Sequence, residues 1–104
     1  MEISESLLAE IQELAKRWKM EEFYLFGSIL TADFRPDSDV DVLVEFRPDA
    51  PWSLFDLVDL REELKKLFKR EVDLIEKRCL LKSRNPLRRE HILLTAKKIY
   101  MEAV

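Results

Sequence analysis

The residues of this sequence that are best suited to chemistry lie between Gly27 and Asp41. Gly27 and Ser28 follow an apolar run that begins at Tyr24, and ten residues separate Ser28 from Asp39. Gly27 is the only glycine of the chain, so the backbone can approach a ligand most closely here. A Gly-Ser turn after a strand presents N–H groups and a hydroxyl, which bind phosphate. The pattern predicts that Gly27 and Ser28 hold phosphate groups, although Ser28 also suits a helix cap.

Asp39 and Asp41 open a second apolar segment that continues to Val44. Side chains in a strand alternate between faces, so both carboxylates point to one side while Val40 and Val42 point to the other. Carboxylate oxygens are the ligands that a hard divalent cation such as Mg²⁺ prefers. The spacing predicts a metal site at the start of this strand. The alternative is an ordinary solvated strand face.

A third carboxylate, Asp73, comes from a separate part of the chain. Residues 71–74 alternate between polar and apolar types, which predicts a strand over residues 71–75 in which Asp73 faces away from Val72 and Leu74. If this strand lies beside the strand of Asp41, the three carboxylates meet. A single aspartate has no spacing signature of its own, so a plain surface position is the alternative.

These motifs together resemble the signature of the polymerase-β-like nucleotidyltransferase superfamily. The similarity rests on the Phe-Gly-Ser of residues 26–28 and on Ser-Asp-Val-Asp-Val-Leu-Val of residues 38–44, and it extends from Phe23 to about Tyr100. The short chain is similar to the minimal nucleotidyltransferases (MNT proteins), whose MntA-type antitoxins are paired with HEPN-domain toxins. An isolated Asp-x-Asp is weak evidence, whereas the whole pattern at this spacing is specific.

The resemblance implies an enzyme that transfers AMP from ATP to a hydroxyl group, with a tyrosine of a HEPN toxin as the expected acceptor. It implies that Asp39, Asp41 and Asp73 are catalytic and bind Mg²⁺, as two ions. It also implies that Gly27 and Ser28, together with Asp39 and Asp41, bind ATP. The protein would act as the antitoxin of its partner and form an oligomeric complex with it.

One segment departs from the family pattern. Many relatives have Arg-Ala-Arg-Gly after Gly-Ser, whereas this chain has Ile-Leu-Thr-Ala at residues 29–32. The change removes cationic groups beside the expected triphosphate and keeps two alternatives open. One is a non-catalytic antitoxin that neutralises its partner by steric binding, and the other is a small-molecule nucleotidyltransferase.

Composition indicates a single globular domain over residues 1–104. The chain is 47% hydrophobic and 38% charged, which excludes a disordered polypeptide. No apolar run approaches the roughly 20 residues of a membrane span. The one cysteine, Cys79, excludes an internal disulfide. We therefore expect a cytoplasmic protein with neither a membrane nor a nucleic acid as its partner.

The net charge of -3 hides an uneven distribution. Residues 1–64 contain 6 Lys and Arg against 16 Asp and Glu, a net charge of -10, whereas residues 65–104 contain 12 against 5, a net charge of +7. Such asymmetry indicates that the C-terminal part meets something negative. We expect its cations to serve the partner protein more than ATP. The alternative is a solvated helix face that pairs within the chain.

Periodicity predicts an α/β (α+β) domain of the polymerase-β-like fold, with a small mixed sheet flanked by helices. The expected helices cover residues 4–19, 53–68 and 86–100, with a helical turn near 28–33 and a connector or short helix at 80–85. The expected strands cover residues 23–26, 39–46 and 71–75.

Overall fold

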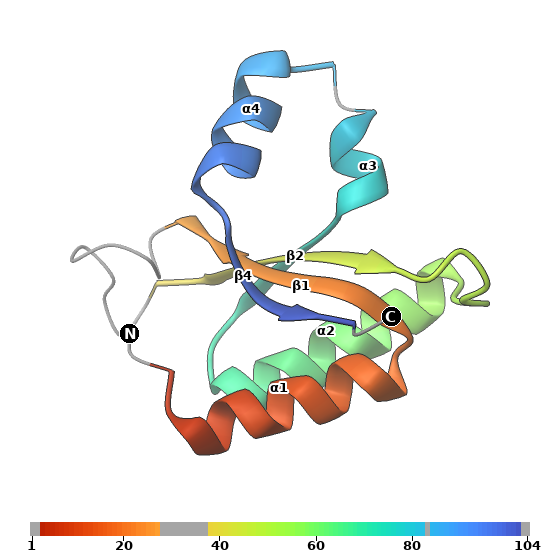
Figure 1. Cartoon of the computed structure of the whole chain (residues 1–104), viewed down its shortest axis with the longest axis vertical. Coiled ribbons are helices and arrows are strands. Elements are labelled where there is room, and N and C mark those ends of the chain that lie inside the picture. Colours follow the sequence, from red (N-terminus) through yellow and green to blue (C-terminus); the bar gives the residue numbers. More distant parts are fainter. Residues whose placement is uncertain (1–2, 28–37, 83, 103–104) are drawn as a thin grey trace.

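A four-stranded sheet lies between two layers of helices in the computed structural model, which describes residues 3–27, 38–82 and 84–102. The helices are α1 (Glu5–Arg17), α2 (Leu54–Phe68), α3 (Lys77–Leu81) and α4 (Pro86–Thr95). The strands are β1 (Met20–Phe26), β2 (Val40–Phe46), β3 (Val72–Glu76) and β4 (Lys97–Met101). Figure 1 shows α1 and α2 below the sheet and α3 and α4 above it.

The sheet is mixed, as predicted. Its strand order is β3-β2-β1-β4. β2 pairs with β1 in antiparallel and with β3 in parallel orientation, and β4 adds to the other edge of β1 in antiparallel orientation. β1 leads into the predicted motif and β2 leads out of it, and these two strands form the centre of the sheet.

Local signals in the sequence explain where the helices begin. Ser4 caps α1 by accepting a hydrogen bond from the Leu7 N–H at 3.1 Å. Ser53 and Asp56 form a reciprocal capping box at the start of α2. Asn85 caps α4, and the following proline occupies a first-turn position that requires no N–H donor. Each cap of this kind contributes about 1 kcal/mol.

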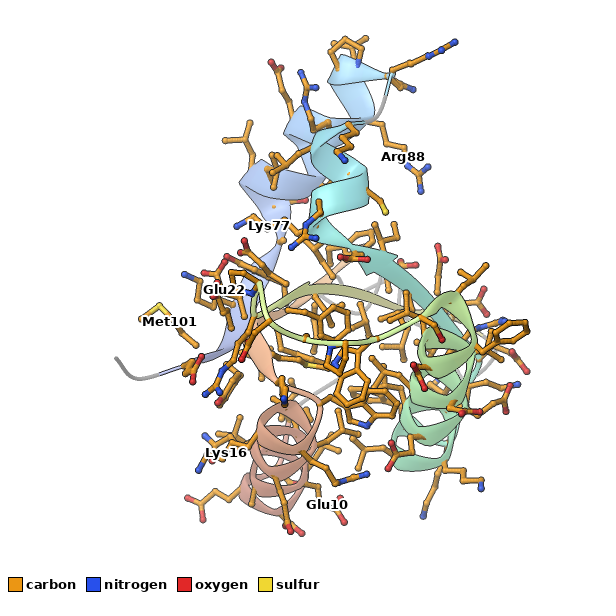
Figure 2. All side chains as sticks on the ribbon, turned by 90° about the vertical axis from the view of Figure 1, so that its right-hand side faces the viewer. Glu10, Lys16, Glu22, Lys77, Arg88 and Met101 are labelled. Atoms are coloured by element: carbon orange, nitrogen blue, oxygen red, sulfur yellow. The ribbon has the colours of Figure 1, made fainter. Side chains whose placement is uncertain are left out.

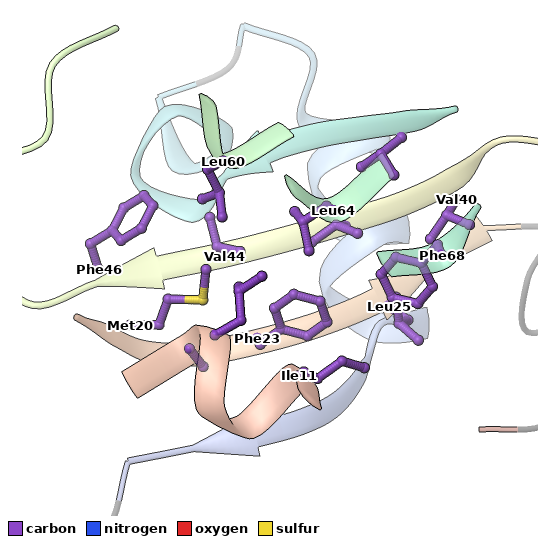
Figure 3. Packing of buried hydrophobic residues seen from close by; sticks show 14 residues of the cluster. Ile11, Met20, Phe23, Leu25, Val40, Val44, Phe46, Leu60, Leu64 and Phe68 are labelled. Carbon is purple, nitrogen blue, oxygen red and sulfur yellow. The ribbon is translucent and has the colours of Figure 1, made fainter. Parts of the chain in front are cut away.

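The main core lies between the sheet and the layer of α1 and α2. Ile11, Phe23, Leu60 and Leu64 are fully buried there, and Figure 3 shows them together with the side chains of β2. Burial of each such side chain contributes about 1.5–3 kcal/mol. This face of the sheet therefore provides most of the apolar packing.

The opposite face carries a smaller apolar cluster. Phe26 and Leu43 of the sheet pack there against Leu80 of α3 and Ile92 of α4. The cluster attaches the upper helices to the sheet but leaves the ends of the strands open to polar groups. Among the described residues, no helix combines the length and the apolar character that a membrane span requires.

The prediction of one last helix as far as residue 100 is wrong. α4 ends at Thr95, Ala96 has extended backbone angles, and the chain continues as β4. The apolar spacing fits a helix locally, but the free edge of β1 offers backbone hydrogen-bond partners to an extended segment. β1 also begins at Met20, three residues before the predicted start. The predicted helical turn near 28–33 lies outside the described residues.

Candidate active site

Three strand ends bring the predicted residues together. Asp41 of β2 lies opposite Phe26 of β1 on one side and opposite Asp73 of β3 on the other. Neighbouring strands are about 4.8 Å apart, and paired positions of parallel strands point to the same face. The condition set for Asp73 by the sequence is therefore met, because its strand lies directly beside that of Asp41.

The carboxylates lie on the face that α3 and α4 cover only in part. Val40 and Val42 are fully buried on the side of α1 and α2, so strand alternation directs Asp41 to the opposite face. Asp39 and Asp73 are exposed, and Asp41 is half-buried. Strand alternation thus places Asp41 and its partner Asp73 at one end of the upper face, and Asp39, one residue before β2, is close enough to raise the pKa of Asp41.

Gly27 lies against the Asp41 carboxylate. Its φ of 76° is in the left-handed region, which costs a residue with a side chain about 1–2 kcal/mol. A Cβ atom at this position would collide with Oδ2 of Asp41. Both the backbone angle and the available space therefore require glycine. Ser28, the other predicted phosphate ligand, lies outside the described residues.

Burial and neighbouring negative charge dominate the electrostatics of the three carboxylates. Burial raises the pKa of Asp41, and the nearby carboxylates of Asp73 and Asp39 raise it further, whereas Arg88 lowers it. Within the described part of the chain, none of the three aspartates forms an ion pair. Like charges are thus held together with little internal compensation.

The donor set fits Mg²⁺ shared with a substrate. Among the described side chains, no three or more His, Cys, Asp or Glu residues form a complete metal-binding group. Mg²⁺ usually takes one or two protein carboxylates and fills its remaining positions with water and substrate phosphates. Asp39 and Asp41, with Asp73 beside them, match that requirement in donor type.

A hollow of about 300 Å³ adjoins Asp73. Its other lining residues are Ile75, Cys79, Leu80 and Arg88. The sequence gives no sign of this hollow, and Arg88 is one of the C-terminal cations that we expected to serve the partner protein. No spacing signal marks these residues, because they converge only when α3 and α4 fold back onto the sheet.

A second charged group lies at the other end of the same face and was also missed. Lys77 Nζ lies 3.0 Å from Glu22 and 3.5 Å from Glu45, and Lys98 Nζ lies 2.7 Å from Glu22. The Lys77 ammonium is 5.3 Å from the centre of the Tyr24 ring. Figure 2 shows Glu22 and Lys77 close together beside α3. We call these five residues the lysine–glutamate network.

Comparison with known proteins relates this geometry to a family. The model of the family described as nucleotidyltransferase domain matches residues 9–101. The chain is similar to protein adenylyltransferase MntA of Thermococcus cleftensis, with 39% identity over 79 residues that make up 76% of this chain and 78% of that protein.

Solved structures give the same fold. A structure described as a minimal nucleotidyltransferase superposes with a TM-score of 0.69 and 29% identity over 88% of each chain. A toxin–antitoxin crystal structure with AMP-PNP gives a TM-score of 0.71 at 21% identity, covering 91% of this chain and 73% of that one. A Shewanella oneidensis complex of a tri-AMPylated HEPN toxin with an MNT antitoxin gives 0.64 at 20% identity, covering 93% and 71%.

Proposed function

The chain belongs to the nucleotidyltransferase domain family and is a nucleotidyltransferase, and from that premise we propose that it transfers AMP from ATP to a tyrosine hydroxyl of a HEPN toxin. The single observation that carries the proposal is the pairing of Asp41 with Asp73, directly beside Gly27. This arrangement supports the proposal, because a glycine suited to close approach of phosphate lies next to carboxylates that can share Mg²⁺ with a triphosphate.

The residues have distinct roles in this proposal. Gly27 leaves room for the phosphates of ATP, and Ser28 adds a hydroxyl donor. Asp39 and Asp41 would hold one Mg²⁺ ion and Asp73 would hold a second, and Asp73 accepts the proton of the acceptor hydroxyl. Bound Mg²⁺ neutralises the charge that develops on the attacking and leaving oxygens of such a displacement.

The transfer forms one bond and breaks one. The acceptor oxygen attacks the α-phosphorus of ATP, the bond to the bridging oxygen breaks, and pyrophosphate leaves with its electron pair. The acceptor proton passes to Asp73 and then to water. The product is a phosphodiester between AMP and the acceptor side chain, which adds a bulky anion to the partner.

A protein acceptor is supported by the relatives. The similar Thermococcus protein is named a protein adenylyltransferase, and a structural neighbour is a complex with an AMPylated HEPN toxin. We infer that this chain binds such a toxin and acts as its antitoxin, within an oligomeric complex and in the cytoplasm. Tyrosine is the acceptor because a phenol is the most acidic side-chain hydroxyl.

The test is transfer to a co-purified HEPN partner in the presence of ATP and Mg²⁺. Intact mass spectrometry should show the partner heavier by one or more AMP groups, and peptide mapping should place AMP on tyrosine. The double variant Asp39→Asn, Asp41→Asn should transfer nothing. Glu45→Gln is the matched control, because Glu45 lies on the same face of the same strand at its other end.

The outcome also decides between transfer and steric neutralisation. The segment at residues 29–32, which lacks the arginines of many relatives, favours steric neutralisation as the second candidate. In that case the partner would be neutralised without any gain in mass, and the double aspartate variant would neutralise as well as the natural chain. Transfer of AMP to a small molecule and not to the partner would indicate the remaining alternative, a small-molecule nucleotidyltransferase.

A further inference from the structure

We propose that Arg88 binds the triphosphate of the nucleotide, from the opposite side of the carboxylates to Gly27. The inference rests on the proposed function and adds a substrate-binding residue to the site. Arg88 is the third residue of α4, and its side chain lines the hollow that also contains Asp73. It was expected to serve the partner protein.

The order of residues across the strands places a ligand between two phosphate-binding groups. Gly27 at the end of β1 lies against Asp41, Asp41 is paired with Asp73 on β3, and Asp73 shares the hollow with Arg88. A triphosphate that reaches from the Gly27 turn across the carboxylates therefore approaches the Arg88 guanidinium.

Arg88 is among the cations of the described chain that have no acidic partner. Within the described residues, its guanidinium forms no ion pair, whereas Arg17, Lys77 and Lys98 each pair with a glutamate at 3.0 Å or less. In Figure 2 the Arg88 side chain leaves the upper helices on the other side from Lys77 and Glu22. The guanidinium thus remains available to an anion.

Its place in the helix is unfavourable unless an anion binds. The positive end of the helix dipole lies at the N-terminus, where acidic side chains stabilise a helix and basic ones do not. The first turn of α4 contains Arg88 and no acidic residue, and Asn85 provides the cap. Helix formation alone gives no reason for an arginine here, whereas a phosphate nearby would be favourable to both the arginine and the helix end.

A guanidinium suits this role because it presents two parallel N–H donors to phosphate oxygens. The triphosphate and the three aspartates are all negative and repel one another. A fixed cation at the edge of the site offsets the part of this repulsion that Mg²⁺ does not neutralise. Recognition of an acidic patch on the partner protein is the competing role for Arg88. The two roles predict opposite effects on nucleotide affinity.

The experiment compares two arginines that carry the same charge. Calorimetric titration measures the dissociation constants of Mg²⁺–ATP and of AMP for the natural chain, Arg88→Gln and Arg84→Gln. Arg84 is exposed and precedes α4, so its replacement is the matched control for net charge. Arg88→Gln should weaken the binding of Mg²⁺–ATP by about 10- to 100-fold and the binding of AMP by less. The dissociation constants of Arg84→Gln should stay within about 2-fold of those of the natural chain.

Two further variants exclude a merely structural effect. Arg88→Lys should retain more ATP affinity than Arg88→Gln, because it keeps a charge but loses the paired donors. If Arg88→Gln lowers the urea midpoint of unfolding, Arg88→Met replaces it in the test, because methionine keeps the apolar stem of the side chain. Arg88→Met should lose as much ATP affinity and unfold at the same urea midpoint as the natural chain.

Equal Mg²⁺–ATP affinity in folded Arg88→Gln and Arg84→Gln would overturn the inference. So would an Arg88→Gln variant that loses only partner capture, which would assign Arg88 to the protein interface. A natural chain that binds no Mg²⁺–ATP would instead overturn the proposed function itself, and the inference with it.

Discussion

Two acidic groups share one face of the sheet, and only one of them is neutralised within the chain. At one end, Glu22 and Glu45 of the lysine–glutamate network are held by Lys77 and Lys98 at 2.7–3.5 Å. At the other end, Asp39, Asp41 and Asp73 form no ion pair among the described residues. The two groups have similar chemistry and opposite surroundings.

The pKa values of Glu22 and Asp41 shift in opposite directions, while the hydrogen bond that Glu45 shares with Glu22 raises the pKa of Glu45. Burial opposes ionisation of Glu22, but hydrogen bonds from Glu45, Lys98 and Lys77 outweigh it and lower its pKa. Burial raises the pKa of Asp41, and neighbouring carboxylates add to the effect. The first group is complete, because it contains its own cations, whereas the second is incomplete, and in the proposed function Mg²⁺ would supply its cations.

The largest expected effect follows from removing one charge of the incomplete group. Asp41→Asn should lower AMP transfer by roughly 100-fold or more, because a bound metal contributes several kcal/mol to transition-state stabilisation. Initial rates at saturating Mg²⁺ and ATP measure the loss. Glu45→Gln, which removes a carboxylate from the other group, should keep transfer within about 3-fold. Equal losses in both variants would contradict the division between the two groups.

Gly27→Ala should abolish the approach of phosphate with a measurable loss of stability. The new Cβ displaces the Asp41 carboxylate. Alanine must also adopt the positive φ of this position, which costs about 1–2 kcal/mol of folding free energy. Mg²⁺–ATP affinity should fall by roughly 10-fold or more. Gly27→Asn tolerates positive φ better, so it should recover some stability and no affinity. Recovery of both by Asn would show that backbone strain, not space, was responsible.

Breaking the complete group should affect stability and spare nucleotide binding. Lys77→Met leaves Glu22 and Glu45 close together with only Lys98 as a counter-charge. We expect unfolding in urea to show a loss of about 1–2 kcal/mol, less than for a fully buried pair because these groups are partly solvated. Mg²⁺–ATP affinity should be unchanged. A large loss of affinity with natural stability would move Lys77 into the active site.

The smallest expected effect is on the pH dependence of folding stability, to which Glu22 and Asp41 contribute with opposite signs. Glu22 has a lowered pKa, so its stabilisation is present above its ordinary 4.5 and is lost as pH falls. Asp41 has a raised pKa, so its favourable protonated form is lost as pH rises above its ordinary 3.8. Without metal, Asp41→Asn should therefore gain a few tenths of a kcal/mol near neutral pH, and Glu22→Gln should lose stability there. Urea midpoints of unfolding between about pH 3 and pH 8 test the gain in Asp41→Asn and the loss in Glu22→Gln. Added Mg²⁺ should reverse the gain in Asp41→Asn and leave the loss in Glu22→Gln unchanged.

The sequence by itself determined what lies within a few residues along the chain. The positive φ of Gly27, the face of β2 that Asp41 occupies, and the caps at Ser4 and Ser53 follow from backbone preferences and strand alternation. These features need no information about distant residues. The type of sheet was also predictable, because the elements alternate and the chain is short.

The tertiary structure decided which distant residues meet. Asp73 reaches Asp41 only because β3 pairs in parallel with β2 in one register, and a shift of one residue would turn it to the other face. Arg88 reaches the hollow only because α3 and α4 fold back onto the upper face of the sheet. The segment from Lys97 to Met101 becomes a strand because the free edge of β1 supplies backbone partners that outweigh its local helical pattern. Pairing energies between distant segments are absent from local sequence, so only the folded chain shows that one acidic group is neutralised and the other is not.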